Sequence, residues 1–182
     1  MRKEIKQLNN RLVAKPVSPE SLTKEQCVRA LAYLMFLKEK QCGTIKGQGC
    51  ANGWKQCDWM SKKDTALPTV STAALILSCL IDAYERRDVA TTDIPGAFLQ
   101  TPDKSKERTH LQFEGVMVEQ LVAIDPDKYQ PHIRIDSKGR KYMYVECLKA
   151  IYGTLNATLL FWQLLSNDLA GWGSFQTHMI CV

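Results

Sequence analysis

The chain of 182 residues is long enough for one domain with its own hydrophobic core, and it contains no internal repeat or low-complexity tract. Its 24 Lys and Arg against 19 Asp and Glu give a net charge of +5, which is compatible with a nucleic-acid partner without requiring one. The longest apolar stretch, residues 72–81, is too short to span a bilayer, and residues 1–6 lack the apolar core of a signal peptide, so we expect an intracellular protein, in cytoplasm or nucleus, with no membrane partner.

The seven cysteines argue against a disulfide scaffold, because their number is odd and no two are spaced C-x-x-C. Cys42, Cys50 and Cys57 cluster, but their spacings of eight and seven fit no common zinc site. In a reducing compartment such thiols are more simply small apolar residues.

The N-terminal segment is polar and basic. Lys15-Pro16 interrupts any regular element in residues 1–17, so we expect an extended leader there. The remaining residues, 18–182, are expected to form a single domain.

Two elements are predicted at the start of this domain. The run Ser-Pro-Glu at residues 18–20 is typical of a helix start, and apolar residues on one face predict a helix over residues 18–40. Residues 43–64 are rich in Gly, Lys and Gln, which predicts a flexible hairpin or loop whose backbone can approach a ligand. Its tryptophans, Trp54 and Trp59, would either stack on bases or pin the loop to the core.

The most regular apolar spacing of the chain lies in residues 68–84. It predicts a helix that packs beneath a sheet. Alternation and β-branched residues then predict a short strand over residues 88–94. Pro95 and Gly96 stop this strand, which leaves the carboxylate of Asp93 at its end.

The rest of the chain shows a clear order of strands and helices. The patterns predict a strand at 109–113, a helix at 116–124, a hairpin with strands at 132–135 and 141–145, and a helix at 157–169. Asp125-Pro-Asp127 is typical of a helix terminator, and D-S-K-G-R at residues 136–140 of a hairpin turn.

Asp93 is the candidate metal ligand of the chain. A hard cation such as Mg²⁺ prefers carboxylate and carbonyl oxygens, and a strand end offers both in the Asp93 side chain and the backbone oxygen of Ile94. The alternative is a carboxylate that is solvated or caps the turn before Pro95 and Gly96.

Three runs carry a resemblance to a known family. DIPGAFL, residues 93–99, resembles the first catalytic motif of copia-type LTR-retrotransposon reverse transcriptases: Asp, three variable residues, Ala, an aromatic residue and Leu. LKAIYGTLNATLLFW, residues 148–162, resembles the family's segment L-K-x-A-L-Y-G-L-K-Q-x-x-x-x-W. IKGQGCANGWKQ, residues 45–56, resembles its fingers segment K-x-R-L-V-A-x-G. The resemblance that these runs carry extends over about residues 20–182.

The resemblance implies an α+β fold, the fingers and partial palm of a polymerase, with a small antiparallel sheet packed on helices. It implies an RNA-directed DNA polymerase that transfers nucleotides from a dNTP to a primer on an RNA or DNA template, with Mg²⁺ as cofactor. Asp93 would be the catalytic metal ligand, assisted by the Ile94 carbonyl, and the Phe98 ring would exclude a 2′-hydroxyl. The nucleotide-binding residues implied are Lys46, Ala97, Phe98 and Asn156.

The chain departs from the family pattern in ways that bear on activity. Gln48 stands where the family usually has Arg, and Asn156, which also suits a helix N-cap, stands where it has Gln. Lys46 and Lys55 are equally compatible with solvated loop charges. No Asp-Asp pair occurs in the 182 residues, and one carboxylate cannot hold two ions.

We therefore expect these residues alone to be inactive as a polymerase, as a truncated or decayed copy would be. The alternative is a non-catalytic retrotransposon relic or nucleic-acid-binding module that keeps the core of the fold. Template preference and oligomeric state stay open.

Overall fold

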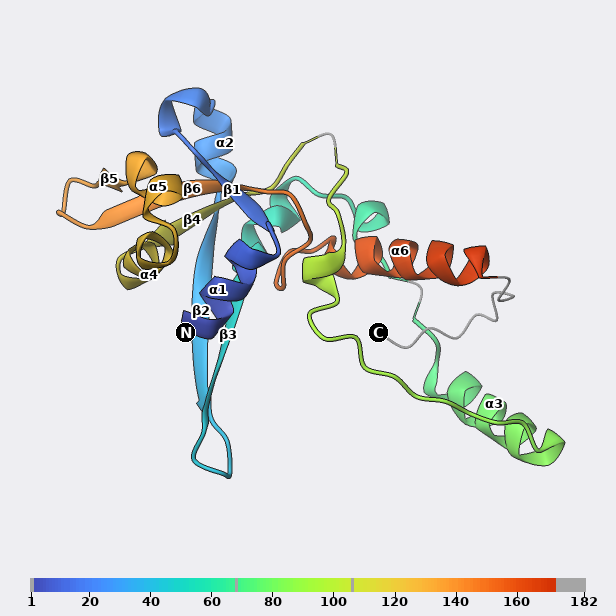
Figure 1. Cartoon of the computed structure of the whole chain (residues 1–182). Coiled ribbons are helices and arrows are strands. Elements are labelled where there is room, and N and C mark those ends of the chain that lie inside the picture. The colour runs from blue at the N-terminus through green and yellow to red at the C-terminus, as the bar shows by residue number, and fades with distance from the viewer. Residues whose placement is uncertain (1, 68, 106, 173–182) are drawn as a thin grey trace.

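A computed structural model describes residues 2–67, 69–105 and 107–172 as a mixed α+β structure with a six-stranded sheet (Figure 1). The strands are β1 (Ala14–Val17), β2 (Leu31–Glu39), β3 (Ile45–Ala51), β4 (His110–Glu114), β5 (Arg134–Ile135) and β6 (Lys141–Cys147). The helices are α1 (Arg2–Asn10), α2 (Lys24–Arg29), α3 (Thr72–Glu85), α4 (Val116–Ile124), α5 (Pro126–Tyr129) and α6 (Ala157–Gly171). Short 3-10 turns are η1 (Pro19–Ser21), η2 (Gly53–Asp58), η3 (Lys62–Asp64), η4 (Phe98–Gln100) and η5 (Gln130–His132). The predicted α+β class is confirmed.

The sheet runs in the order β1-β6-β4-β2-β3, with β5 on β6. Most neighbours are antiparallel, but β2 and β4 run parallel, with Leu31 opposite Leu111. The expected purely antiparallel sheet is therefore a mixed one. The parallel pairing covers only Leu31 and Ala32, so the rest of β2 pairs with β3 alone. Strands β2 and β3 form a ribbon that projects beyond the sheet (Figure 1).

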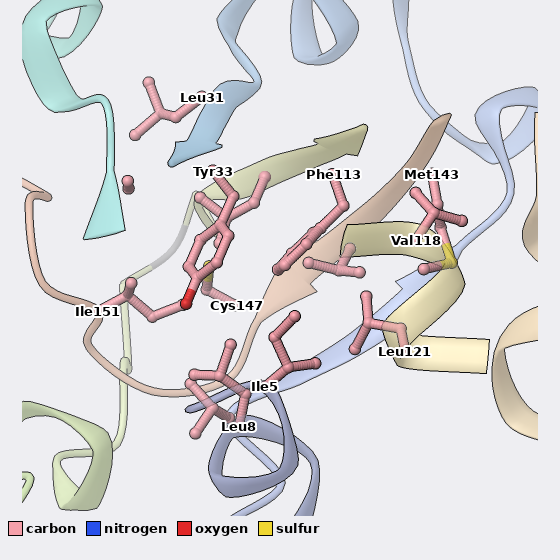
Figure 2. Close-up of a cluster of buried hydrophobic side chains, with 14 of the residues drawn as sticks. Ile5, Leu8, Leu31, Tyr33, Phe113, Val118, Leu121, Met143, Cys147 and Ile151 are labelled. Carbon is pink, nitrogen blue, oxygen red and sulfur yellow. The ribbon is translucent and has the colours of Figure 1, made fainter. Parts of the chain in front are cut away.

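The hydrophobic core lies where the sheet meets α1 and α4 (Figure 2). Alternate residues of the strands face it, since successive side chains of a strand point to opposite faces. The buried strand residues include Leu31, Tyr33, Leu111, Phe113, Met143, Val145 and Cys147, and the helices add Ile5, Leu8, Val118 and Leu121. The ring of Tyr33 stacks on that of Phe113 at 4.3 Å between centroids. Burial raises the pKa of the Tyr33 phenol.

Residues 1–17 are not an extended leader, because residues 2–10 form α1 and residues 14–17 form β1. Ile5 is fully buried and Leu8 nearly so, three positions apart on one face of α1. The Asn9 side-chain oxygen accepts hydrogen bonds from Lys128 Nζ at 2.9 Å and Tyr129 Oη at 2.8 Å. Pro16 is tolerated because β1 is an edge strand.

The predicted helix over residues 18–40 is also wrong, since only α2 is an α-helix there, η1 precedes it, and residues 31–39 form the strand β2. Thr23 and Gln26 form a capping box at the start of α2. Leu31 and Tyr33 are buried and Ala32 is exposed, a period of two that follows the pairing of β2 with β3. In residues 31–39, pairing with neighbouring strands outweighs the local preference for a helix. The hairpin expected in residues 43–64 exists, with β2 as its first strand.

The helix predicted over residues 68–84 is confirmed as α3, and its N-cap Ser71 accepts a hydrogen bond from Ala74 N at 3.2 Å. Its predicted packing beneath the sheet is wrong. No residue of α3 is buried, and Leu80 and Tyr84 are more than half exposed. In Figure 1 the helix extends away from the sheet.

The later elements are confirmed: β4, α4, the β5–β6 hairpin and α6 lie where the patterns predict them. Asp125 ends α4 and caps α5, accepting from Lys128 N at 3.3 Å. Residues 173–182 lie outside the described residues, and with them the segment 176–182, which by the family resemblance would approach a hairpin that carries two aspartates. Within the described part of the chain, none of the helices has the length and apolar character needed to cross a membrane.

The role of α1 in the core can be tested with one substitution. Ile5→Ala should lower the free energy of unfolding by about 2–5 kcal/mol, because a fully buried side chain leaves a cavity. Ile76→Ala makes the same change on exposed α3 and should cost at most about 0.5 kcal/mol. Urea denaturation measures both, and equal effects would contradict this position of α1.

Candidate functional site

Asp93 lies in a stretch, residues 87–94, without regular structure, and the strand predicted over residues 88–94 is therefore wrong. A strand needs a neighbouring strand that satisfies its backbone groups, and no described strand pairs with residues 87–94. The Asp93 side chain is exposed. The predicted stop at Pro95 and Gly96 does occur as a turn, and the short helix η4 follows it.

The aromatic ring of Phe98 connects the two runs that carry the family resemblance. It packs against Tyr152 at 4.8 Å between centroids and against Phe161 at 5.9 Å. Burial raises the pKa of the Tyr152 phenol, and the negative charge of Asp93 adds to this rise.

Hydrogen bonds hold the turn, residues 93–98, beside the segment 148–156. Gln100 Nε2 donates to the Pro95 oxygen at 3.0 Å, and Thr101 Oγ1 donates to the Ala97 oxygen at 3.2 Å. The backbone of Thr101 accepts in turn from Ala150 N at 2.9 Å. This buried threonine thus joins the turn to the segment that leads to Tyr152.

The segment 148–156 is itself fixed against the end of β3. Ala51 N donates to the Tyr152 oxygen at 2.7 Å, and Leu155 N donates to the buried side chain of Gln56 at 2.9 Å. Gly153 has φ +89, and a Cβ there would overlap the backbone oxygen of Ala51. A glycine is needed at this crossing for both reasons.

Sequence reasoning missed Arg11, which also contacts the turn. Its guanidinium donates to the backbone oxygen of Gly96 at 3.0 Å and lies 3.4 Å from that of Pro95. No local pattern could have indicated this contact, because the partners are 84 and 85 positions away in the chain and Arg11 belongs to the supposed leader.

Asn156 lies in a different place from the turn. It stands at the N-terminus of α6, but its side chain makes no capping bond and is nine-tenths buried. It lines an open hollow of about 900 Å³ between α2, the turns η2 and η3, the loop before β4, and α6. Asp93, Ala97 and Phe98 do not line this hollow.

Lys46 is also separate from the turn. It lies on β3 opposite Lys38, in the exposed half of the β2–β3 ribbon. In Figure 1 the tip of that ribbon is well away from the segment that returns from α3 to η4. The structure thus keeps Asp93, Ile94, Ala97 and Phe98 on one turn, and it leaves Lys46 on the ribbon, away from them.

The donors around Asp93 do not fit a pair of metal ions. Among the described residues no group of three or more His, Cys, Asp or Glu side chains could hold a metal. One exposed carboxylate and the neighbouring Ile94 carbonyl suit a single, mostly hydrated Mg²⁺. Two-ion transfer chemistry needs more carboxylates than this.

Comparisons with models of protein families, with curated proteins and with solved structures find no match to this chain.

The close approach of Gly153 to Ala51 and the left-handed backbone conformation of Gly153 can be tested separately. Gly153→Ala should lower the free energy of unfolding by roughly 1–2 kcal/mol for the left-handed conformation and by about 1–3 kcal/mol more for the overlap with Ala51. Gly139 has φ +77, and no atom lies within 4 Å of a Cβ added there. Gly139→Ala should therefore lose only the roughly 1–2 kcal/mol for the left-handed conformation. Thermal or urea unfolding of both variants gives the difference, and equal losses would contradict the crossing.

Proposed function

We propose that this chain forms the fingers and the first part of the palm of a copia-type reverse transcriptase, with residues 93–98 as its nucleotide-binding turn. The contact between the rings of Phe98 and Tyr152 carries the proposal. Each ring belongs to one of the two specific family-like runs, and independent loops would have no reason to meet.

The order of elements supports the same proposal. A projecting hairpin that carries Lys46 comes first, then a helix and the Asp93 turn, and α6 follows the Tyr152 segment. In the resembled family the hairpin belongs to the fingers and contacts the triphosphate. The exposed, unpaired apolar side of α3 suits a helix whose packing partner lies beyond the described residues.

The proposed chemistry of the turn is binding without complete catalysis. Asp93 and the Ile94 carbonyl would hold one divalent ion, which would neutralise phosphate charge when bound. Phe98, held by Tyr152, would lie under the sugar and leave no room for a 2′-hydroxyl. Ala97 is small enough to leave space for the sugar and base. Since further carboxylates are needed for transfer, we expect no template-directed synthesis by these residues alone.

The turn can be tested by NMR with Mn²⁺ and dTTP as probes. Mn²⁺ should broaden the amide signals of residues 93, 94 and 96–98, because the ion would lie at Asp93. Asp93→Asn should weaken this effect by about tenfold or more, since a neutral amide is a poor partner for a divalent ion.

Asp127→Asn is the matched control, because Asp127 is an exposed aspartate on α5, outside the turn. It should leave the broadening unchanged. Broadening that persists in Asp93→Asn, or that is absent from the unsubstituted chain, would refute the proposed site.

A second candidate function is single-stranded nucleic-acid binding without catalysis, favoured by the hollow that contains Asn156. Arg29 there is neutralised by Glu25 at 2.7 Å and Glu107 at 3.3 Å, and it lies over the ring of Trp59. The remaining cations of the hollow, Lys63 and Arg108, form no ion pair within the described part of the chain.

Lys63 and Arg108, two cations beside an aromatic ring and a buried amide, suit a phosphate backbone with a stacked base. Lys63→Gln with Arg108→Gln should weaken binding of a fluorescent single-stranded oligonucleotide. The slope of log affinity against log salt should fall by about 1.4, because each lost phosphate contact removes about 0.7. Fluorescence anisotropy measures both quantities.

Lys3→Gln with Lys138→Gln removes the same charge from exposed positions outside the hollow. If this control pair lowers affinity as much as the first pair, the hollow is not the binding site and only net charge matters.

A further inference from the structure

Arg11 contacts the turn through its planar guanidinium. Nη1 donates to the Gly96 oxygen at 3.0 Å and lies 3.4 Å from the Pro95 oxygen, and Nη2 lies at the same 3.4 Å from the Pro95 oxygen. A guanidinium presents several donors in one plane, so it can bind two successive carbonyls, whereas an ammonium reaches such a pair only as a point charge.

The turn is shaped to receive this side chain. Gly96 has φ +63, and a Cβ there would lie 2.7 Å from Arg11 Nη1 and 3.0 Å from Gln7 Nε2. A side chain at position 96 would therefore displace the ends of the Arg11 and Gln7 side chains from the turn. The same Pro95 oxygen also accepts from Gln100, so two side chains hold this carbonyl.

The backbone at Arg11 is anchored to the second family-like run. Lys149 Nζ donates to the Arg11 oxygen at 2.8 Å. Two residues on, the Val13 oxygen accepts from the amides of Leu148 at 2.8 Å and Lys149 at 3.2 Å. Arg11 thus stands between residues 148–149 and the turn, with contacts to both.

The charges agree with this position. Burial and the negative charges of Glu4 and Asp93 raise the pKa of the Tyr152 phenol, and the positive charge of Arg11 lowers it. The Phe98 ring packs on Tyr152 from the far end of the turn.

We propose that Arg11 is a positioning residue that fixes residues 95–96, and thereby the approach of Asp93 and Phe98 to Tyr152. The consequence for metal binding rests on the function proposed for Asp93. The role of Arg11 in fixing the turn does not depend on that function, so the order of the turn and the binding of metal can be measured separately.

Amide hydrogen exchange measures the turn alone. The amides of Gln100 and Thr101 bond to the Ala97 and Phe98 oxygens in η4. In Arg11→Ala they should exchange about tenfold faster, because bonds to a charged donor are lost at the start of the turn. The Cys147 amide, bonded to Thr109 within the sheet, should keep its rate and show that the fold is intact.

Two further variants make the result specific. Arg11→Lys keeps the charge and can reach one carbonyl, so it should restore part of the protection. Arg140→Ala removes a more exposed arginine that bonds to Asp136 on the β5–β6 hairpin, and it should leave the exchange rates of Gln100 and Thr101 unchanged.

Mn²⁺ broadening of residues 93–98 is the second measurement. If the unsubstituted chain binds Mn²⁺, Arg11→Ala should weaken it several-fold and Arg11→Lys should restore part of the loss. If the unsubstituted chain binds none, the function proposed for Asp93 fails while the exchange result still decides the role of Arg11. Unchanged exchange at Gln100 and Thr101 in Arg11→Ala, or equal acceleration at Cys147, would overturn the positioning role.

Discussion

The path of residues 148–156 across the end of the sheet is the constraint on which the rest of the structure depends. Its backbone receives or gives a hydrogen bond at almost every step: to Val13 before β1, to Asp103 and Thr101 after η4, to Ala51 at the end of β3, and to the side chain of Gln56. Regions far apart in sequence therefore meet along one segment. Gly153 allows this path because no side chain stands between it and β3.

This segment explains why a candidate site exists although Asp93 is not on a strand. The turn has no strand neighbour among the described residues, and its position comes from side chains: Gln100 and Thr101, which follow the turn, and Arg11, which follows α1. The packing of Phe98 on Tyr152 then sets which way the turn faces. A site held by side chains in this way is ordered only if the N-terminal helix is in place.

The structure also separates two chemistries that the family resemblance places together. One surface carries a single carboxylate and an aromatic ring, which suits one hydrated cation with a nucleotide. The other is a hollow with Trp59, the cations Lys63 and Arg108 and the buried amide of Asn156, which suits a phosphate chain with a base. Both are compatible with nucleic-acid chemistry, and neither holds the carboxylates that nucleotidyl transfer needs.

The sequence by itself determined the elements whose signals are local. Spacing of apolar residues gave α3, α4 and α6, and turn residues gave the β5–β6 hairpin and the break after Asp93, since these depend on contacts within a few residues. Only the tertiary structure decided that residues 31–39 are a strand, that residues 2–17 belong to the core, and that Asp93 lies in an irregular turn held by Arg11. Each of these depends on partners from distant parts of the chain, and strand pairing and burial outweigh local preference when such partners are present.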